Sequence, residues 1–270
     1  MLVGNSEEAK RAWFGKGSGL YLPRRFAAGF QSAAAQTVLR HSANRAARSR
    51  DAPLLQSYII SVCNMYSMMG DHAAIENRVG RPSSFPVNLV TAPTIVPNDL
   101  APVVIQTKPS TEVVTMRWGF PPAPGRGGRR PHALIRNAVS DWWKPWIAKR
   151  EHRCLVPVTS FCEYDRRTIP PRPTWFAIDP ARSLFFFAGI WRRCEGTEGS
   201  DSVADEHFRF AILIARAGAM LESIERTLVP VVLLTSHQRD VWMEGSLDQA
   251  LALQRPEPPG ALRIDATALP

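Results

Sequence analysis

Two apolar stretches, RCLVPVTSFCEY at residues 153–164 and LFFFAGIW at residues 184–191, give the strongest structural signal in this chain. Both are rich in β-branched and aromatic residues, which favour extended strands. Similar runs lie at residues 112–120, 174–178, 208–215 and 229–234, and prolines and glycines separate them. The sequence therefore predicts that strands dominate the chain after residue 62.

Short helices are expected between these strands. The expected positions are residues 72–78, residues 217–224, a helix capped by Ser236 that ends at Gly245, and a last one capped by Ser246 that stops before Pro256. Because strands follow one another without regular βαβ alternation, the sequence predicts an α+β domain with a mostly antiparallel, barrel-like sheet and a few short flanking helices.

Residues 1–61 differ in composition from the rest of the chain. They hold nine Lys and Arg against three Asp and Glu, so most of the net charge of +9 lies there and the remainder is only mildly basic. An organellar transit peptide, a short Ala-rich surface helix and a wrongly assigned start codon all fit this composition. We expect a disordered extension over residues 1–61 and a single domain over residues 62–270.

Composition also limits the class of protein. The chain is 45% apolar, enough for one substantial core, but no window of 18 or more apolar residues interrupts it. We therefore expect a soluble cytoplasmic protein that does not bind membranes. Because the domain itself is only mildly basic, binding of nucleic acid must depend on a local patch and not on net charge.

The four cysteines show no metal-binding or disulfide pattern. Cys63, Cys154, Cys162 and Cys194 form no C-x-x-C pair and no zinc-like spacing with the six histidines. We expect no metal and no other cofactor. Cys154, Cys162 and Cys194 are expected to be buried, inert thiols.

A series of short motifs runs through the domain in a fixed order. They are CNMYS at residues 63–67, AP at 101–102, MRWGF at 116–120, IRN at 135–137, RCLVP at 153–157, FCEY at 161–164, AGIW at 188–191 and VPVVL at 229–233. In this order and with these separations, they resemble the SOS response-associated peptidase (SRAP) family over residues 63 to about 256.

The resemblance implies a specific covalent chemistry at Cys63. In the family this cysteine becomes the first residue, and its α-amine and thiol close a thiazolidine ring on the aldehyde of an abasic site in single-stranded DNA. An α-amine and a thiol, with reference pKa values of about 8 and 8.5, both have nucleophilic fractions near neutral pH. The implied protein is an enzyme with self-processing peptidase activity, DNA–protein crosslinking and a lyase-like step.

Val62 precedes Cys63, so Cys63 lacks a free amine in the full chain. A GTG codon encodes Val internally and Met at initiation, so translation starting at residue 62 would free the amine after removal of Met. Cleavage between Val62 and Cys63, by the protein itself or by an aminopeptidase, would give the same terminus. A retained extension predicts a protein that cannot form thiazolidine.

Further site residues follow from the resemblance. Glu163 matches the family's catalytic glutamate, and burial among apolar residues tends to raise the pKa of a carboxyl group, which suits acid–base work. Arg136 matches an arginine that holds a DNA phosphate. Trp118 matches an aromatic beside the DNA, although core packing is an equal alternative. Asn64 is expected to contact DNA or fix the amine.

Two positions depart from the family pattern. Leu134 stands where the family has an asparagine, and Glu225 stands where it has a histidine. Glu225 could serve as a catalytic group if proximity to Glu163 raised its pKa, or it could pair with Arg226 or solvent. We expect capture to be retained but slower, and reversal to be impaired.

Two other functions compete with capture. In one, the chain is a catalytically impaired single-stranded DNA-binding protein, with Leu134 and Glu225 as marks of lost activity. In the other, it is a cysteine peptidase that pairs Cys63 with a histidine, namely His72, His132 or His152. If the protein captures abasic sites, we expect its partner to be single-stranded DNA with abasic sites and the protein to be a monomer.

Overall fold

The computed structural model describes residues 65–80, 83–84, 89, 91–107, 110–121, 131–194 and 208–265. All of them belong to the unit Leu54–Pro270. The expected extension over residues 1–61 lies outside the described residues, as do Cys63 and Asn64.

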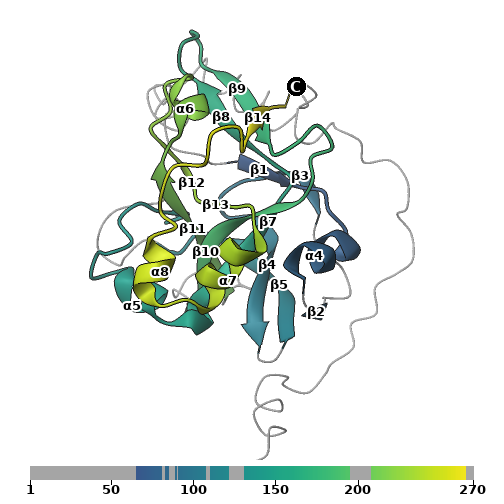
Figure 1. Ribbon diagram of the computed structural model, residues 1–270, viewed down its shortest axis with the longest axis vertical. Coiled ribbons are helices and arrows are strands. Elements are labelled where there is room, and N and C mark those ends of the chain that lie inside the picture. Colours follow the sequence, from purple (N-terminus) through teal and green to yellow (C-terminus); the bar gives the residue numbers. More distant parts are fainter. Residues whose placement is uncertain are drawn as a thin grey trace, which may run out of the picture. The chain divides into compact units, whose positions relative to one another are not determined.

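Strands make up most of the described structure (Figure 1). They are β1 (Met65–Met68), β2 (Ser83–Ser84), β3 (Ala92–Ile95), β4 (Leu100–Thr107), β5 (Ser110–Trp118), β6 (Leu134–Ile135), β7 (Arg153–Val158), β8 (Ser160–Asp165), β9 (Arg172–Ala177), β10 (Phe185–Arg193), β11 (Phe208–Arg216), β12 (Leu228–Pro230), β13 (Val232–Leu233) and β14 (Arg263–Ile264). The helices are short: α4 (His72–Val79), α5 (Lys144–Ala148), η1 (Arg150–His152), α6 (Ala219–Glu222), α7 (Ser236–Glu244) and α8 (Leu247–Leu251).

Five strands of the larger sheet close on themselves. Antiparallel pairing joins β5 to β4, β4 to β7, β7 to β10 and β10 to β11. The ring is completed by parallel pairing between β11 and β5, with Phe210 opposite Trp118. The prediction of a mostly antiparallel, barrel-like α+β fold is therefore confirmed, with parallel pairing at the closure.

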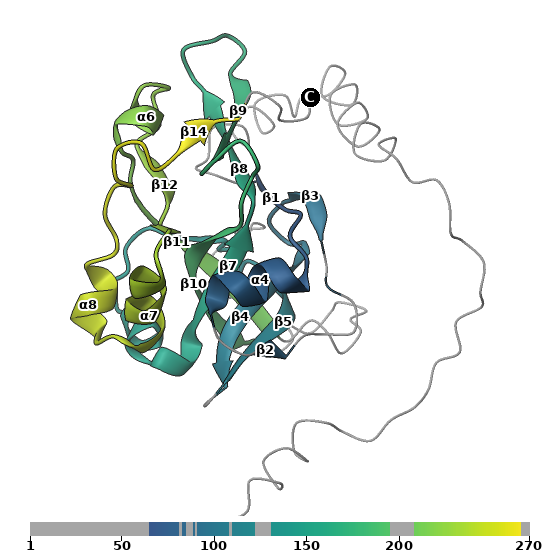
Figure 2. The ribbon, with the colours of Figure 1, turned by 45° about the vertical axis from the view of Figure 1, so that its right-hand side comes forward.

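A second sheet has the strand order β14-β9-β8-β1-β3. It is joined to the barrel by β7 and β8, which are consecutive in the chain (Figure 2). The sequence predicted one strand over residues 153–164, whereas the structure breaks it at Thr159. There the backbone N–H of Thr159 donates to the carbonyl of Ser67 on β1. The chain therefore passes from the barrel to the second sheet at Thr159, and the next strand, β8, carries Glu163.

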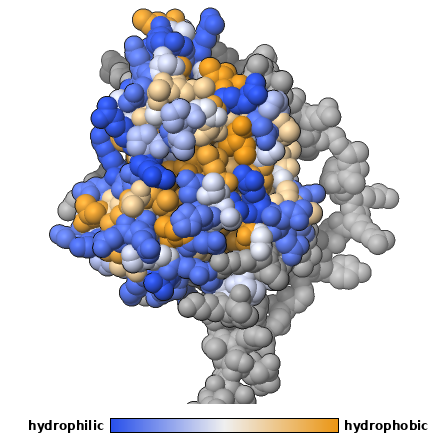
Figure 3. Space-filling model, viewed as in Figure 1, coloured by the Kyte–Doolittle hydropathy of each residue, from blue (hydrophilic) through white to orange (hydrophobic). Residues whose placement is uncertain are grey.

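The core consists of the buried faces of these strands. Every residue of β7 is buried, and so are the first six residues of β10, because both strands lie in the middle of the large sheet. On β5, buried and more exposed positions largely alternate, as expected when one face meets the core. Figure 3 shows apolar side chains gathered in the middle of one face, with hydrophilic residues around them.

The four expected helices differ from the sequence prediction mainly at their ends, and helices α5 and η1 were not predicted. The cap of α7 is Thr235 and not Ser236, since the Thr235 side chain accepts from the N–H of Gln238. The cap of α8 is Ser246, as predicted. Helix α6 occupies only part of the expected residues 217–224. No helix in the described part of the chain is long and apolar enough to cross a membrane.

Candidate active site

Glu163 lies on β8, in the middle of the second sheet. In register, Thr174 on β9 stands opposite it. Its neighbour Cys162 stands opposite Met65 on β1. The Glu163 side chain is completely buried. A buried carboxylate costs free energy unless a charged or hydrogen-bonding partner compensates it, so the surroundings of Glu163 decide its chemical state.

Arg226 is that compensating partner. Its Nε lies 2.7 Å from Oε2 of Glu163, and only 3% of its side chain is exposed. We expected an apolar pocket that raises the pKa of the Glu163 carboxyl. The structure instead shows a buried ion pair, and an adjacent guanidinium favours the ionised carboxylate. Nothing in the motif comparison singled out Arg226, because the resemblance placed no functional residue there.

A tight loop after α6 brings Arg226 to this position. The backbone N–H of Arg226 donates to the carbonyl of Leu221, and the N–H of Arg166, just after β8, donates to the carbonyl of Ile224. Between them, Glu225 adopts a left-handed backbone conformation with φ of 58°. As a result Arg226 is buried and Glu225 is exposed.

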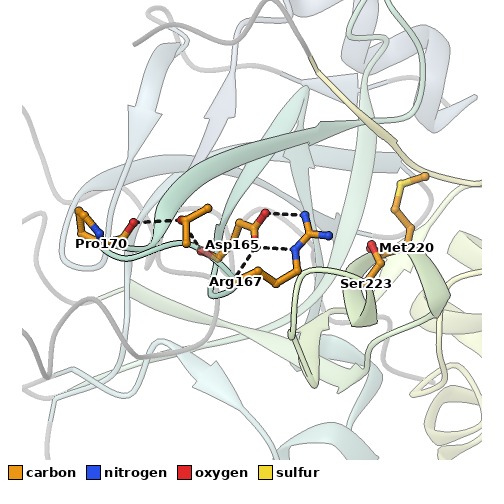
Figure 4. A network of polar contacts seen from close by, with 6 residues as sticks. Asp165, Arg167, Pro170, Met220 and Ser223 are labelled. Carbon is orange, nitrogen blue, oxygen red and sulfur yellow. Dashed lines mark hydrogen bonds and ion pairs between the residues drawn. The ribbon is translucent and has the colours of Figure 1, made fainter.

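Glu225 therefore lies on the solvent side of this loop. Its charge contributes to a raised pKa of Arg167, whose main cause is the hydrogen bond between Arg167 and Asp165. Figure 4 shows the Asp165–Arg167 ion pair on the turn between β8 and β9. The same hydrogen bond lowers the pKa of Asp165. The structure thus places Arg226, and not Glu225, against Glu163.

Arg136 lies just beyond the short strand β6. Its side chain is exposed, and its carbonyl oxygen accepts a hydrogen bond from Nε2 of Gln254. Gln254 also donates to the carbonyl of Ile214 on β11, which ties the Arg136 backbone to the barrel. Leu134 is half-buried and pairs with Ile212 on β11. Arg136 is therefore a cation on a fixed backbone, available to an anionic ligand.

Trp118 belongs to the core. It is fully buried at the end of β5, and its Nε1–H donates to the carbonyl of Ala133. Its rings stack on Phe210 and meet the edge of Tyr66. The structure therefore places Trp118 in the core, which is one of the two alternatives that the sequence left open.

A cluster of aromatic rings surrounds Arg192, near the end of β10. The guanidinium carbon of Arg192 lies 4.7 Å from the ring centroid of Trp146, 5.0 Å from that of Phe120 and 5.5 Å from that of Trp142. These are cation–π distances. Trp142 is 49% exposed, an unusually high value for a tryptophan. In the sequence, only the close spacing of Trp142, Trp143 and Trp146 indicated this aromatic cluster.

The described cysteines are buried thiols, as expected. Burial raises the pKa of the Cys162 thiol to about 12 and also raises the pKa of Cys154 and Cys194. A thiol with a raised pKa stays protonated at neutral pH and is a poor nucleophile. None of these three cysteines is therefore suited to nucleophilic chemistry.

Other possible sites do not coincide with the expected residues. Within the described ranges, no group of three or more His, Cys, Asp or Glu side chains could hold a metal ion. A hollow of about 630 Å³ lies between η1 and the α7–α8 turn, lined in part by Gln106, Lys149 and Ser246. It includes none of the expected site residues.

A closed five-stranded barrel, a flanking sheet and a buried Glu–Arg pair beside β1 define an α+β protein with a candidate acid–base centre. Residues 62–266 match the model of the family described as SOS response associated peptidase (SRAP). The match spans about three quarters of the chain, so this chain belongs to the SRAP family.

Solved structures show the same fold at low sequence identity. A protein of Bordetella bronchiseptica is 18% identical with a TM-score of 0.62, and the match covers 77% of this chain and all of that one. A protein of Bacteroides thetaiotaomicron is also 18% identical, with a TM-score of 0.59, covering 75% of this chain and 90% of that one. A phage-related protein of Bordetella bronchiseptica is 18% identical with a TM-score of 0.53, covering 75% and 92%. Curated protein sequences gave no match.

Proposed function

We propose that this protein captures abasic sites in single-stranded DNA as a covalent adduct on Cys63, after the residues before Cys63 are absent or removed. Membership of the SRAP family supports this proposal, and the family match begins at residue 62, directly before the cysteine. In this proposal Glu163 is the acid–base group and Arg136 binds a phosphate of the DNA backbone.

The reaction joins an aminothiol to an aldehyde. The α-amine nitrogen of Cys63 attacks the aldehyde carbon of the ring-opened deoxyribose, and the resulting carbinolamine loses water to give an imine. The thiol then adds across the carbon–nitrogen double bond, forming a carbon–sulfur bond while its proton passes to the nitrogen. The products are a thiazolidine and one water molecule, and no oxidant or reductant is needed.

The observation that carries the proposal is the buried Glu163 beside the strand that follows the cysteine. Met65 on β1 pairs with Cys162, the neighbour of Glu163, and Cys63 precedes Met65 by two residues. In the sequence, Cys63 therefore lies just before the strand that pairs with β8.

Base stacking in this proposal falls to Trp142 and not to Trp118. The Trp142 ring is partly exposed and lies over Arg192, so an unpaired base could stack on it beside a cation. Arg136 and Trp142 lie six residues apart in the segment between β6 and α5. One segment therefore offers both a phosphate contact and an aromatic surface.

Denaturing gel electrophoresis tests the proposal directly. Single-stranded DNA with one abasic site is incubated with the full chain and with protein that begins at Cys63. We expect a gel-stable adduct from the second form only. Cys63→Ala should abolish the adduct, Cys63→Ser should prevent ring closure, and acetylation of the terminal amine should block the reaction. A thiol-only peptidase would stay active after acetylation, which would overturn the proposal.

A non-covalent DNA binder of the same fold is the second candidate. It is favoured by Leu134 at the family's asparagine position and by the exposure of Glu225 at the histidine position. In that case the protein beginning at Cys63 would shift single-stranded DNA in a native gel, and the denaturing gel would show no adduct.

A further inference from the structure

The Glu163–Arg226 pair joins two segments that are distant in the sequence. Glu163 lies on β8, and Arg226 lies in the loop between α6 and β12. Both side chains are buried, with 2.7 Å between Nε and Oε2. Such a contact differs from a surface salt bridge, because dissolved salt screens a buried pair much less than an exposed one.

The loop geometry fixes which residue faces the carboxylate. Backbone hydrogen bonds from Arg226 to Leu221 and from Ala217 to Thr227 close the loop on both sides of Glu225. The left-handed conformation of Glu225 turns its side chain outward. Arg226 is therefore held toward Glu163 by the backbone, and not only by the attraction between charges.

Two opposing effects act on the Glu163 carboxyl group. Burial disfavours its ionised form, whereas a guanidinium in contact favours it. Arginine keeps its proton throughout the range in which proteins are stable. Neutralising the carboxyl would leave a buried arginine without its counter-charge, which is a strongly unfavourable state. The contact with arginine therefore favours the ionised carboxylate over the neutral carboxyl group.

We propose that Arg226 is a positioning residue that keeps Glu163 ionised, so that Glu163 enters the capture reaction as a proton acceptor. This inference rests on the proposed function. The carboxylate takes a proton from the nitrogen of Cys63 as the carbon–nitrogen bond forms. The proton it has accepted is then available to the hydroxyl group that leaves as water.

Other ionisable groups surround the pair and bear on its pH dependence. On β8 the Cys162 thiol is adjacent and remains protonated. Asp165 ends β8 and pairs with Arg167 on the following turn, and Arg172 of β9 lies opposite Asp165. Glu225 lies on the loop of Arg226, and the amine and thiol of Cys63 join the group in the proposed function. Of these groups, Arg226 forms the buried ion pair with the carboxylate.

The first test measures ionisation without any activity. Infrared difference spectra of the full chain, wild type minus Glu163→Gln, are recorded between about pH 5 and pH 8. We expect a carboxylate band for Glu163 over the whole range and no protonated carboxyl band. A protonated Glu163 at about pH 7 would overturn the inference, even if the protein forms the DNA adduct. Absence of the adduct with an ionised Glu163 would overturn the proposed function alone.

The second test follows the pH dependence of adduct formation, using the form of the protein that reacts with abasic DNA. Without the guanidinium, Glu163 should protonate near neutral pH. Arg226→Met is therefore expected to slow capture by about 100-fold at pH 6 and much less at pH 9. Arg226→Lys keeps the charge and should keep the wild-type pH profile. A uniform loss in Arg226→Met at every pH would show a structural role and contradict the inference.

Removal of one partner could prevent folding, so a charge-neutral double variant provides the control. Glu163→Gln with Arg226→Met leaves no unpaired buried charge and should fold as well as the wild type. This variant should form the adduct slowly, and the rate should show no pH dependence from a carboxyl group at position 163. If this variant reacts at the wild-type rate, neither residue takes part and the inference fails.

Discussion

Glu225 and Arg226 are adjacent in the sequence but lie in opposite environments. The left-handed backbone of Glu225 directs its carboxylate to solvent, while Arg226 is buried against Glu163. The expectation that Glu225 lies beside Glu163 came from its position relative to the VPVVL strand. A single residue with positive φ reverses that expectation, because it changes which of two consecutive side chains points inward.

The backbone of Glu225 should make its substitutions unequal. A left-handed conformation costs about 1 to 2 kcal/mol for most residues and less for asparagine. We expect Glu225→Val to lower the free energy of unfolding by about 1 kcal/mol, and Glu225→Asn to change it by less than about 0.5 kcal/mol. Denaturant unfolding measures both, and Glu225→Gln controls for loss of charge. Equal stabilities of the Val and Asn variants would contradict the assigned backbone conformation.

The raised pKa values of the buried thiols predict selective alkylation. Because burial raises the pKa of Cys162 to about 12, only a minute fraction is thiolate at about pH 8. Iodoacetamide should leave Cys154, Cys162 and Cys194 unlabelled in the native protein and label all three after denaturation. Peptide mass spectrometry reads each site. Rapid labelling of native Cys162 would show that its strand opens to solvent.

Trp142 should contribute to binding of single-stranded DNA. Stacking of one base is worth about 1 to 3 kcal/mol, so Trp142→Ala should weaken binding roughly tenfold. Trp142→Phe retains a ring and should lose less. Val139, exposed in the same segment, provides a matched control through Val139→Ala. Fluorescence anisotropy with a labelled oligonucleotide compares them, and equal losses in the Ala variants would argue against stacking.

Among the elements, the helices show how end residues are selected. Thr235 and Ser236 both have the hydroxyl that an N-cap requires. Only Thr235 has extended backbone angles and an oxygen that reaches the N–H of Gln238, while the Gln238 side chain returns a bond to the Thr235 N–H. The capping box therefore places the cap one residue earlier than we expected from Ser236.

Substitutions at these two hydroxyls distinguish the capping residue from its neighbour. Thr235→Ala removes the acceptor for the Gln238 N–H and should lower the free energy of unfolding by about 1 kcal/mol. Ser236→Ala should change it by less than about 0.5 kcal/mol. Chemical denaturation of the two variants measures the difference. A larger loss of stability in Ser236→Ala would show that Ser236 is the capping residue, as the sequence predicted.

At the scale of the whole domain, the barrel depends on the pairing between β5 and β11. Gly119 follows β5 directly, and its N–H donates to the carbonyl of Phe210 on β11. Its φ of 105° lies in a region that side chains rarely adopt, and a Cβ atom there would lie 2.6 Å from Cβ of Pro131. Glycine is required at this point because two chain segments approach closely where the ring closes.

Gly119→Ala should therefore destabilise the domain strongly. Backbone strain and the clash with Pro131 together predict a loss of about 3 kcal/mol in the free energy of unfolding. Gly80 is a matched control with φ of 71° and open space around it, so Gly80→Ala should cost about 1 kcal/mol. Denaturant unfolding compares the two. If both variants lose the same free energy of unfolding, the close approach between Gly119 and Pro131 does not contribute to the cost.

The amino-acid sequence alone determined the features that depend on local chemistry. Runs of β-branched and aromatic residues marked most strands, and the motifs marked the family. The N-cap of α8 at Ser246 and the burial of the thiols of Cys154, Cys162 and Cys194 followed from residue type. Strands β1, β3 and β4 were not predicted. Each of these inferences used residues that are close together in the chain.

Only the tertiary structure determined the barrel closure, the burial of Trp118 and the pairing of Arg226 with Glu163. Trp118 and Phe210 are far apart in the sequence, as are Glu163 and Arg226. Local preferences do not encode which distant strands or side chains meet. That choice depends on the register of paired strands and on the direction of each loop, because both are set by packing of the complete core.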